Sequence, residues 1–260
     1  MSTPPLPFAR HIVRPGRAMR LSPLRIALLA GTAALLTIFD RAIYHAVEAP
    51  GIEGEDWYQV LRQLGYMPTW IIVALLLYLV DRNAPPPHLI TGPLTSPVSG
   101  PRPWKPSQPR RPAHHRAGLL LLSATLAGLA AETLKAVCRR YRPEAADGHY
   151  LFDPWLTATG TDALGLGHML GLGIAPDVET GFGLPSGHTA VAFGACAMLG
   201  MLIPPIKVPL LLLAAGCGFS RMLAGAHYST DVLVGAVLGI AVAGVLFKAG
   251  ERPGVPLDRA

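Results

Sequence analysis

Charged residues are scarce in this chain of 260 residues, at 15% of the positions, whereas 51% are hydrophobic. A soluble domain usually carries about a quarter charged residues, so the deficit excludes an ordinary soluble domain and points to a membrane. The net charge of +6 does not indicate a nucleic-acid partner, because the basic residues flank apolar runs. Nucleic-acid binding would need a basic stripe interleaved with aromatic side chains.

Cysteine is also rare, with three residues in the chain. Cys138, Cys196 and Cys217 are widely spaced and lie in or beside apolar segments, which excludes a disulfide framework and a cysteine-based metal site. We interpret them as small buried hydrophobic residues. No spacing typical of metal ligands occurs elsewhere, and we expect neither a metal ion nor another cofactor.

Six apolar segments are candidate membrane spans: Leu24–Val47, Leu64–Val80, Ala117–Val137, Ser186–Ile203, Ile206–Met222 and Thr230–Phe247. The third and the sixth are long enough on their own to cross a hydrocarbon core of about 30 Å. Small residues are dense at Gly194–Ala197 and Gly235–Gly239, and such residues let membrane helices approach closely. The sequence therefore predicts an all-α, polytopic membrane protein with six transmembrane helices.

A cleaved signal peptide is the alternative for the first segment, because arginines precede it and Val47-Glu48-Ala49 loosely resembles a cleavage site. Two features disfavour cleavage. Pro50 would follow the cut, and Asp40-Arg41 separates the apolar core from the site.

Lysine and arginine predict the orientation, because they accumulate in cytoplasmic loops. They are frequent in the N-terminal tail, in the second connection and at the C-terminal end, whereas the first connection is rich in acidic residues. We therefore expect both termini in the cytoplasm and connections one, three and five outside.

The same features divide the chain into five parts: a basic cytoplasmic tail (1–23), two transmembrane helices (24–83), a cytoplasmic linker (84–116), a four-helix core (117–248) and a cytoplasmic tail (249–260). Ten prolines fall between positions 84 and 112. Such a density excludes regular backbone hydrogen bonding and predicts an extended linker, with a docking site for a proline-binding partner as the alternative.

Three polar clusters lie at the predicted outer ends of the last four segments. The first runs from Lys135 to Arg142 and Pro143. Seven residues are nearly two helical turns, so we expect Lys135 and Arg142 on one helix face, about 10 Å apart, with the helix ending just before Pro143. The second cluster, Leu184–Thr189, opens the fourth segment, where Ser186 is placed as the helix N-cap.

The third cluster joins the fifth and sixth segments and contains Arg221, His227 and Asp231. A helical turn would bring Asp231 within reach of the His227 imidazole. Cations, a helix N-terminus and a histidine backed by a carboxylate together describe an oxyanion site. Each part alone has a plainer explanation, because interfacial cations often extend to lipid headgroups. We assign Arg139 and Arg140 to such contacts.

The pattern Lys-x6-Arg-Pro, Pro-Ser-Gly-His and Ser-Arg-x5-His-x3-Asp resembles the three signature motifs of the type 2 phosphatidic acid phosphatase superfamily. The matching positions are Lys135, Arg142, Pro143, Pro185, Ser186, Gly187, His188, Ser220, Arg221, His227 and Asp231. The resemblance covers residues 117–247. It implies a six-helix, metal-independent phosphatase with its active site at the outer membrane-face ends of helices 3 to 6.

The resemblance also implies catalytic roles. His227 attacks phosphorus and becomes phosphohistidine, and Asp231 orients it. His188 protonates the leaving alkoxide and later activates water. The phosphoryl oxygens are held by Lys135, Arg142, Ser186, the N–H of Gly187, and Arg221.

Together with the size of the chain and its basic linker, the resemblance implies a bacterial-type inner membrane. A membrane lipid phosphate is the implied substrate. Phosphatidic acid, phosphatidylglycerol phosphate, undecaprenyl diphosphate and a lipid A phosphate all fit, because the motifs contact the phosphoryl group that they share. A vanadate-dependent haloperoxidase is one alternative, disfavoured by the six spans. A transporter or a catalytically silent scaffold is another; the filled histidine positions argue against silence, and a transporter would be expected to show broken helices in paired halves. The oligomeric state is left open.

Two features have no assigned catalytic role. Glu132 is an intramembrane acid, which is commonly functional, although an ion pair with Lys135 is the simpler explanation. The connection 139–184 is long for a loop, and we interpret it as an interfacial lid. Its histidines, His149 and His168, have no partner spacing and are given no role.

Overall fold

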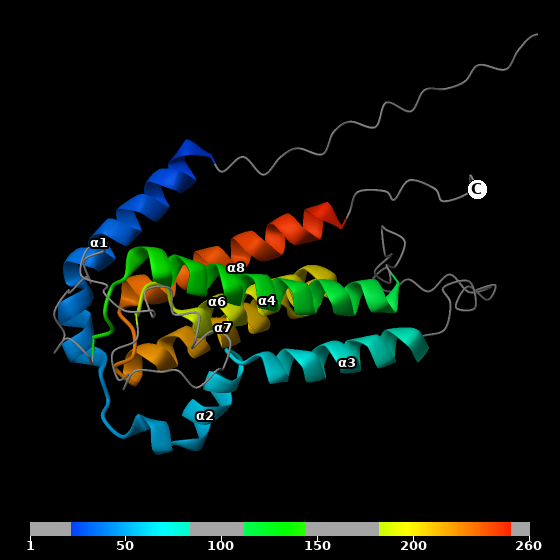
Figure 1. Ribbon diagram of the computed structural model, residues 1–260, viewed down its shortest axis with the longest axis horizontal. Helices are drawn as coiled ribbons and strands as arrows, with labels where there is room; N and C mark the ends of the chain where they lie inside the picture. Colours follow the sequence, from blue (N-terminus) through cyan, green and yellow to red (C-terminus); the bar gives the residue numbers. More distant parts are fainter. Residues whose placement is uncertain (1–21, 84–111, 144–181, 251–260) are drawn as a thin grey trace, which may run out of the picture.

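The computed structural model describes residues 22–83, 112–143 and 182–250 (Figure 1). Within these ranges the chain is helical, without a β-strand, and the only bridge of the β type joins Tyr141 to Phe182. The predicted all-α class is therefore confirmed for the described residues. Most of the basic tail, of the proline-rich linker, of the C-terminal tail and of the connection 139–184, including His149 and His168, lies outside them.

Six long helices coincide with the six predicted apolar segments: α1 (Pro23–Val47), α3 (Met67–Asn83), α4 (Ala113–Cys138), α6 (Gly187–Leu202), α7 (Lys207–Leu223) and α8 (Ser229–Ala249). Among the described helices, α1, α4, α7 with its preceding turn, and α8 are long and apolar enough to cross a membrane. The bent pair of α2 and α3 is a fifth candidate. The apolar helix α6 has 16 residues and is about 24 Å long.

The first connection contains two helices that the apolar pattern did not predict, η1 (Ile52–Gly54) and α2 (Asp56–Gln63). Helix α2 meets α3 at an angle of 66°. Two side chains of α3 hold this bend: Trp70 Nε1 donates to the carbonyl of Leu64 and Thr69 Oγ1 to that of Gln63, both at 2.8 Å. We call residues 64–66 the elbow. The second span therefore begins three residues later than predicted, because the elbow separates it from α2.

Helix α4 begins at Ala113, three residues before the end of the predicted linker at residue 116. Arg116 is buried within its first turns and forms an ion pair with Asp81 at the end of α3. It also donates to the carbonyl of Leu202 at 3.1 Å. This buried pair joins three helices at one end of the bundle.

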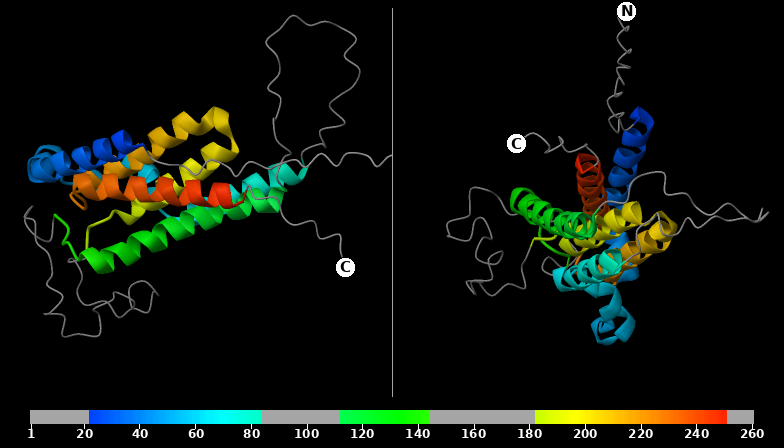
Figure 2. Two further views of the ribbon diagram at one scale, coloured as in Figure 1. Left: turned by 90° about the horizontal axis from the view of Figure 1, so that it is seen from above. Right: turned by 90° about the vertical axis from the view of Figure 1, so that its right-hand side faces the viewer.

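Helix α6 occupies the centre of the bundle and contacts α4, α7 and α8 (Figures 1 and 2). Small residues allow this, as predicted. Ser123 Oγ of α4 donates to the carbonyl of Gly194 at 2.8 Å. A Cβ atom at Gly235 of α8 would lie 2.6 Å from the carbonyl oxygen of Ser186. Close approach supplies the packing that holds helices together in lipid, where apolar side chains gain little by association.

The end of α4, the start of α6, the end of α7 and the start of α8 lie at the same end of the bundle (left in Figure 1). The three polar clusters of the sequence are attached to these helix ends. The antiparallel arrangement of the last four helices thus brings them together.

Candidate active site

Ser186 caps helix α6, as predicted. Its buried hydroxyl oxygen accepts hydrogen bonds from the Thr189 backbone N–H at 3.4 Å and from the Thr189 hydroxyl at 2.9 Å. Its own N–H donates to the carbonyl of Asp231 at 3.0 Å, which ties the start of α6 to the start of α8. The first-turn N–H groups at Gly187 and His188 lie at the positive end of the helix dipole, where an anion is favoured.

His227 lies in the turn between α7 and α8. The turn uses Gly225 at φ +71°, a conformation that favours glycine. Nδ1 of His227 is 3.4 Å from Oδ2 of Asp231, and the same oxygen accepts the N–H of Tyr228 at 2.9 Å. Because Asp231 engages Nδ1, Nε2 is the ring nitrogen that this carboxylate leaves open. Both side chains are buried.

The predicted shared helix face of Lys135 and Arg142 is wrong. Helix α4 ends at Cys138, where Arg139 adopts a left-handed conformation with φ 50° as the C-cap. The segment that follows is held by a hydrogen bond of 2.7 Å from the N–H of Gly183 to the carbonyl of Arg140. Arg142 therefore reaches the site from this segment. Its charge and that of Lys135 are nevertheless both close enough to act on His227.

The assignment of Arg139 and Arg140 to lipid headgroups is also wrong, because both side chains are buried. Arg140 forms an ion pair with Oδ1 of Asp231 and donates to the hydroxyl of Thr230 at 3.0 Å. Its guanidinium lies 5.0 Å from the centre of the Tyr228 ring. Arg140 thus holds the second oxygen of the carboxylate whose first oxygen faces His227.

The simpler explanation of Glu132 is confirmed, since its Oε1 lies 2.6 Å from Nζ of Lys135. Gly187 permits this pair to approach the start of α6. A Cβ atom there would lie 2.8 Å from Oε1 of Glu132 and 3.4 Å from Nζ of Lys135. Lys135 is thereby placed beside the N-terminus of α6.

His188 lies among cations. The charges of Arg221, Arg62 and Lys135 and the ring of His227 all act on it electrostatically. Its Nε2 is buried and makes no hydrogen bond within the described part of the chain, and the same holds for Nε of Arg221. Buried polar atoms without partners are costly in proteins, and a bound ligand would relieve this cost.

Four residues at this site do not belong to any of the three motifs: Asp40, Tyr58, Arg62 and Tyr66. Asp40 of α1 is fully buried and accepts hydrogen bonds from the Ser229 and Thr230 hydroxyls, and from the Thr230 N–H at 3.0 Å. An aspartate inside an apolar segment was a signal that could have found it. The other three come from α2 and the elbow, where no sequence pattern marks them.

Burial lowers the pKa of His227 from 6.5 to about 4, although Asp231 opposes this shift. A lowered pKa favours a nucleophile. Between pH 4 and 6.5 an ordinary histidine is protonated, whereas the His227 ring keeps its free lone pair. We expect kcat/KM for an aryl phosphate to fall as the pH is lowered, with a midpoint near pH 4. The ionisation of the substrate is titrated separately, and its contribution is removed from the profile. A midpoint near 6.5 would show that His227 titrates normally.

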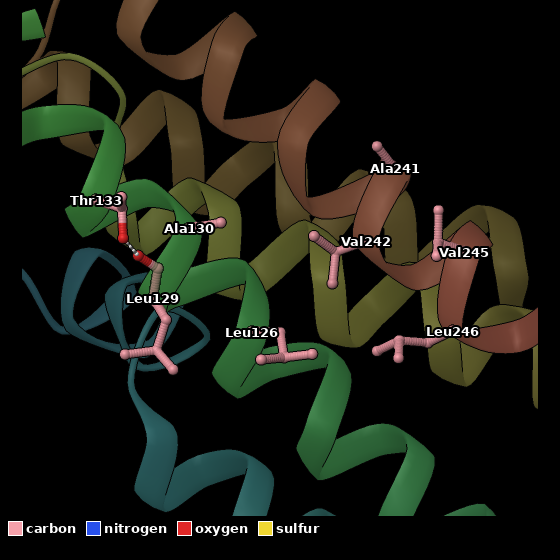
Figure 3. A pocket seen from close by; sticks show the side chains of 8 residues that line it. All are labelled: Leu126, Leu129, Ala130, Thr133, Ala241, Val242, Val245 and Leu246. Atoms are coloured by element: carbon pink, nitrogen blue, oxygen red, sulfur yellow. Dashed lines mark hydrogen bonds between the residues drawn. The ribbon is translucent and has the colours of Figure 1, made fainter. Parts of the chain in front are cut away.

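No group of three or more histidine, cysteine, aspartate or glutamate residues is placed to hold a metal ion in the described ranges. An apolar groove of about 450 Å³ lies between α4 and α8 and is shown in Figure 3. Its lining consists of Leu126, Leu129, Ala130, Thr133, Ala241, Val242, Val245 and Leu246. Without a charged side chain it is suited to hydrocarbon and not to phosphate.

The chain is thus a helical protein with candidate membrane spans, and its histidines and cations gather at one end of the bundle. Residues 116–253 match the PAP2 superfamily, and the chain belongs to this superfamily. The family resemblance drawn from the three motifs is thereby confirmed.

Two known proteins are similar to the chain. A lipid A 1-phosphatase of Porphyromonas gingivalis is 37% identical over 102 residues, which cover 34% of this chain and 23% of that protein. The chain thus spans about a quarter of the length of this curated relative. The crystal structure of Aquifex aeolicus LpxE covers 82% of this chain and 94% of its own, with 20% identity and a TM-score of 0.48.

Proposed function

We propose that this protein hydrolyses a phosphate monoester or diphosphate on a membrane lipid through a phosphohistidine intermediate. The observation that carries the proposal is the convergence of two histidines, one backed by Asp231, with Lys135, Arg142 and Arg221 at one end of an apolar bundle. Membership of the PAP2 superfamily and the similarity to a lipid A 1-phosphatase support it.

The chemistry divides into two steps. Nε2 of His227 attacks phosphorus, the bond from phosphorus to the leaving oxygen breaks, and His188 donates a proton to that oxygen. His188 then takes a proton from water, which attacks the phosphorus and breaks its bond to nitrogen, releasing inorganic phosphate. Guanidinium groups suit this task because they bind phosphoryl oxygens bidentately. Stabilisation of the developing charge by fixed cations is a large contribution to such catalysis.

The test is phosphate release by the purified protein from a panel of phosphatidic acid, phosphatidylglycerol phosphate, undecaprenyl diphosphate and a lipid A phosphate. We expect release from at least one of these lipids. Halide oxidation in the presence of vanadate would support the haloperoxidase alternative. A protein without either activity would fit the transporter or scaffold alternative.

We expect the hydrolysis to survive excess chelator, because the proposed steps use only side chains and magnesium sites need several oxygen ligands. Orthovanadate should inhibit competitively, since it adopts the five-coordinate geometry of a phosphoryl group under attack. Both are measured with the same lipid substrate. Complete loss of activity with chelator and its recovery with magnesium would contradict the assignment.

We further propose six spans, with α6 and the α2–α3 pair completing the set, and the site on the extracytoplasmic side with both termini in the cytoplasm. The basic second connection and the acidic first connection support this orientation. A reporter active only in the periplasm should function when fused near Glu53 or Asp162, and should be silent near Ser99 or at Ala260. The opposite pattern would place the motifs in the cytoplasm.

A further inference from the structure

Helix α2 and the elbow form a wall of the site next to His188. The Tyr66 ring meets the His188 ring edge-on, with 4.7 Å between the two centroids. Gly65 packs so closely that a Cβ atom there would lie 2.5 Å from Cδ2 of His188. These residues precede the part of the chain that matches the PAP2 superfamily. The wall is therefore an addition to the three motifs.

Arg62 is the cation of this wall. Its guanidinium lies 5.4 Å from the centre of the Tyr66 ring, so Tyr66 contacts both Arg62 and His188. The Arg62 charge acts on His188. Nε of Arg62 is buried and makes no hydrogen bond, and no carboxylate lies within ion-pair distance of the side chain, as far as the structure describes the chain.

The other cations of the site have defined partners or tasks. Lys135 pairs with Glu132, and Arg140 pairs with Asp231. Nη1 of Arg221 donates to the Tyr58 hydroxyl at 2.5 Å. Lys135, Arg142 and Arg221 already account for the transferred phosphoryl group in the proposed function. Arg62 is a further positive charge, placed on the side of the histidine that protonates the leaving group.

We infer that Arg62 binds a second phosphate on the leaving-group side of the scissile bond, so that the enzyme prefers a lipid diphosphate to a monoester. This inference rests on the proposed function, because it uses the role of His188. With a diphosphate, His227 attacks the terminal phosphorus and the bridging P–O bond breaks. The electron pair stays on the bridging oxygen of the departing lipid monophosphate.

The physical reason is the charge that the leaving group acquires. A departing alkoxide needs a proton from His188. A departing phosphate, whose second pKa is about 6, leaves as an anion that a guanidinium stabilises through bidentate hydrogen bonds. Those bonds strengthen as the bridging oxygen gains charge, and interactions that strengthen in the transition state raise the rate.

The experiment compares a polyprenyl diphosphate with the monophosphate of the same chain and with an aryl phosphate. Arg62→Gln should lower kcat/KM for the diphosphate about 10²-fold, which is the scale for loss of a charge-assisted hydrogen bond. The loss on the monophosphate and on the aryl phosphate should be at least tenfold smaller than the loss on the diphosphate. Arg62→Lys, which keeps the charge and loses the bidentate geometry, should fall between. Arg82→Gln, an exposed arginine at the far end of α3, is the matched control and should change nothing.

An unchanged thermal unfolding midpoint shows that Arg62→Gln is folded. Equal losses on the diphosphate and the monophosphate, or no loss on either, would overturn the inference and leave the proposed function standing. A wild-type protein that releases phosphate from none of the three substrates would instead reject the proposed function. Inorganic pyrophosphate supplies a readout of binding: it should inhibit the wild type more tightly than phosphate does, and Arg62→Gln should remove this difference.

Discussion

His227→Ala should abolish phosphate release from every substrate and leave no phosphorylated protein. In the proposed mechanism the buried ring of His227 accepts the phosphoryl group, and its Nδ1 lies 3.4 Å from Asp231. Removing the nucleophile of a covalent hydrolase costs on the order of 10⁶-fold in kcat. A better leaving group does not compensate for this loss, because the first bond to phosphorus cannot form.

The measurement is rapid quenching with a substrate labelled in the phosphoryl group, followed by isolation of the protein. His45→Ala is a matched control, since His45 is exposed at the end of α1 and has no place in the mechanism. The control should form labelled protein at the wild-type rate. Labelled protein in His227→Ala would assign the nucleophile to another residue.

The parts of the fold that the sequence predicted are those set by local properties. Apolar runs locate the six long helices, because backbone groups in lipid must be satisfied within the segment. The N-cap at Ser186 depends on residues within one turn, and the His227–Asp231 pair on a spacing of four residues. Neither requires knowledge of another helix.

The incorrect predictions concern residues whose conformation depends on a partner far away in the sequence. The carboxylate partner of Arg140 is Asp231, which lies 91 residues later in the chain. No periodicity in the sequence indicates this pairing. The α4 helix ends at Cys138 instead of continuing to Arg142 because the next residues turn towards this partner and towards Gly183. Arg140 was therefore interpreted as a lipid contact, whereas in the structure it holds the carboxylate of Asp231 in place.

The elbow was unpredictable for the same reason. Tyr58 contacts Arg221 across 163 residues, and the bend between α2 and α3 is held by Thr69 and Trp70 side chains. The α2 helix is too polar to be recognised as an apolar segment. The spacing of its aromatic and basic side chains matches no motif. Asp40 differs, because an aspartate within an apolar segment can be recognised from the sequence alone.

The second large effect is expected from His188→Ala, and it should depend on the leaving group. In the first step of the proposed mechanism His188 protonates an alkoxide, which departs poorly unaided, whereas a nitrophenolate needs no such help. In the second step His188 activates the water that cleaves phosphohistidine. General acid–base catalysis of this kind is worth roughly 10²–10⁴-fold. His188→Ala should therefore be nearly inactive on a lipid phosphate monoester.

On an activated aryl phosphate the same variant should release one equivalent of nitrophenolate in a burst and then stall. Acid-labile phosphoprotein should accumulate, because His227 is intact and only the water step is impaired. The ring nitrogen Nε2 of His188 is buried without a hydrogen-bond partner among the described residues, which fits a group that serves the substrate and not the fold. Rapid quenching of His188→Ala beside His227→Ala gives the comparison. Phosphoprotein in His227→Ala and none in His188→Ala would exchange the roles of the two histidines.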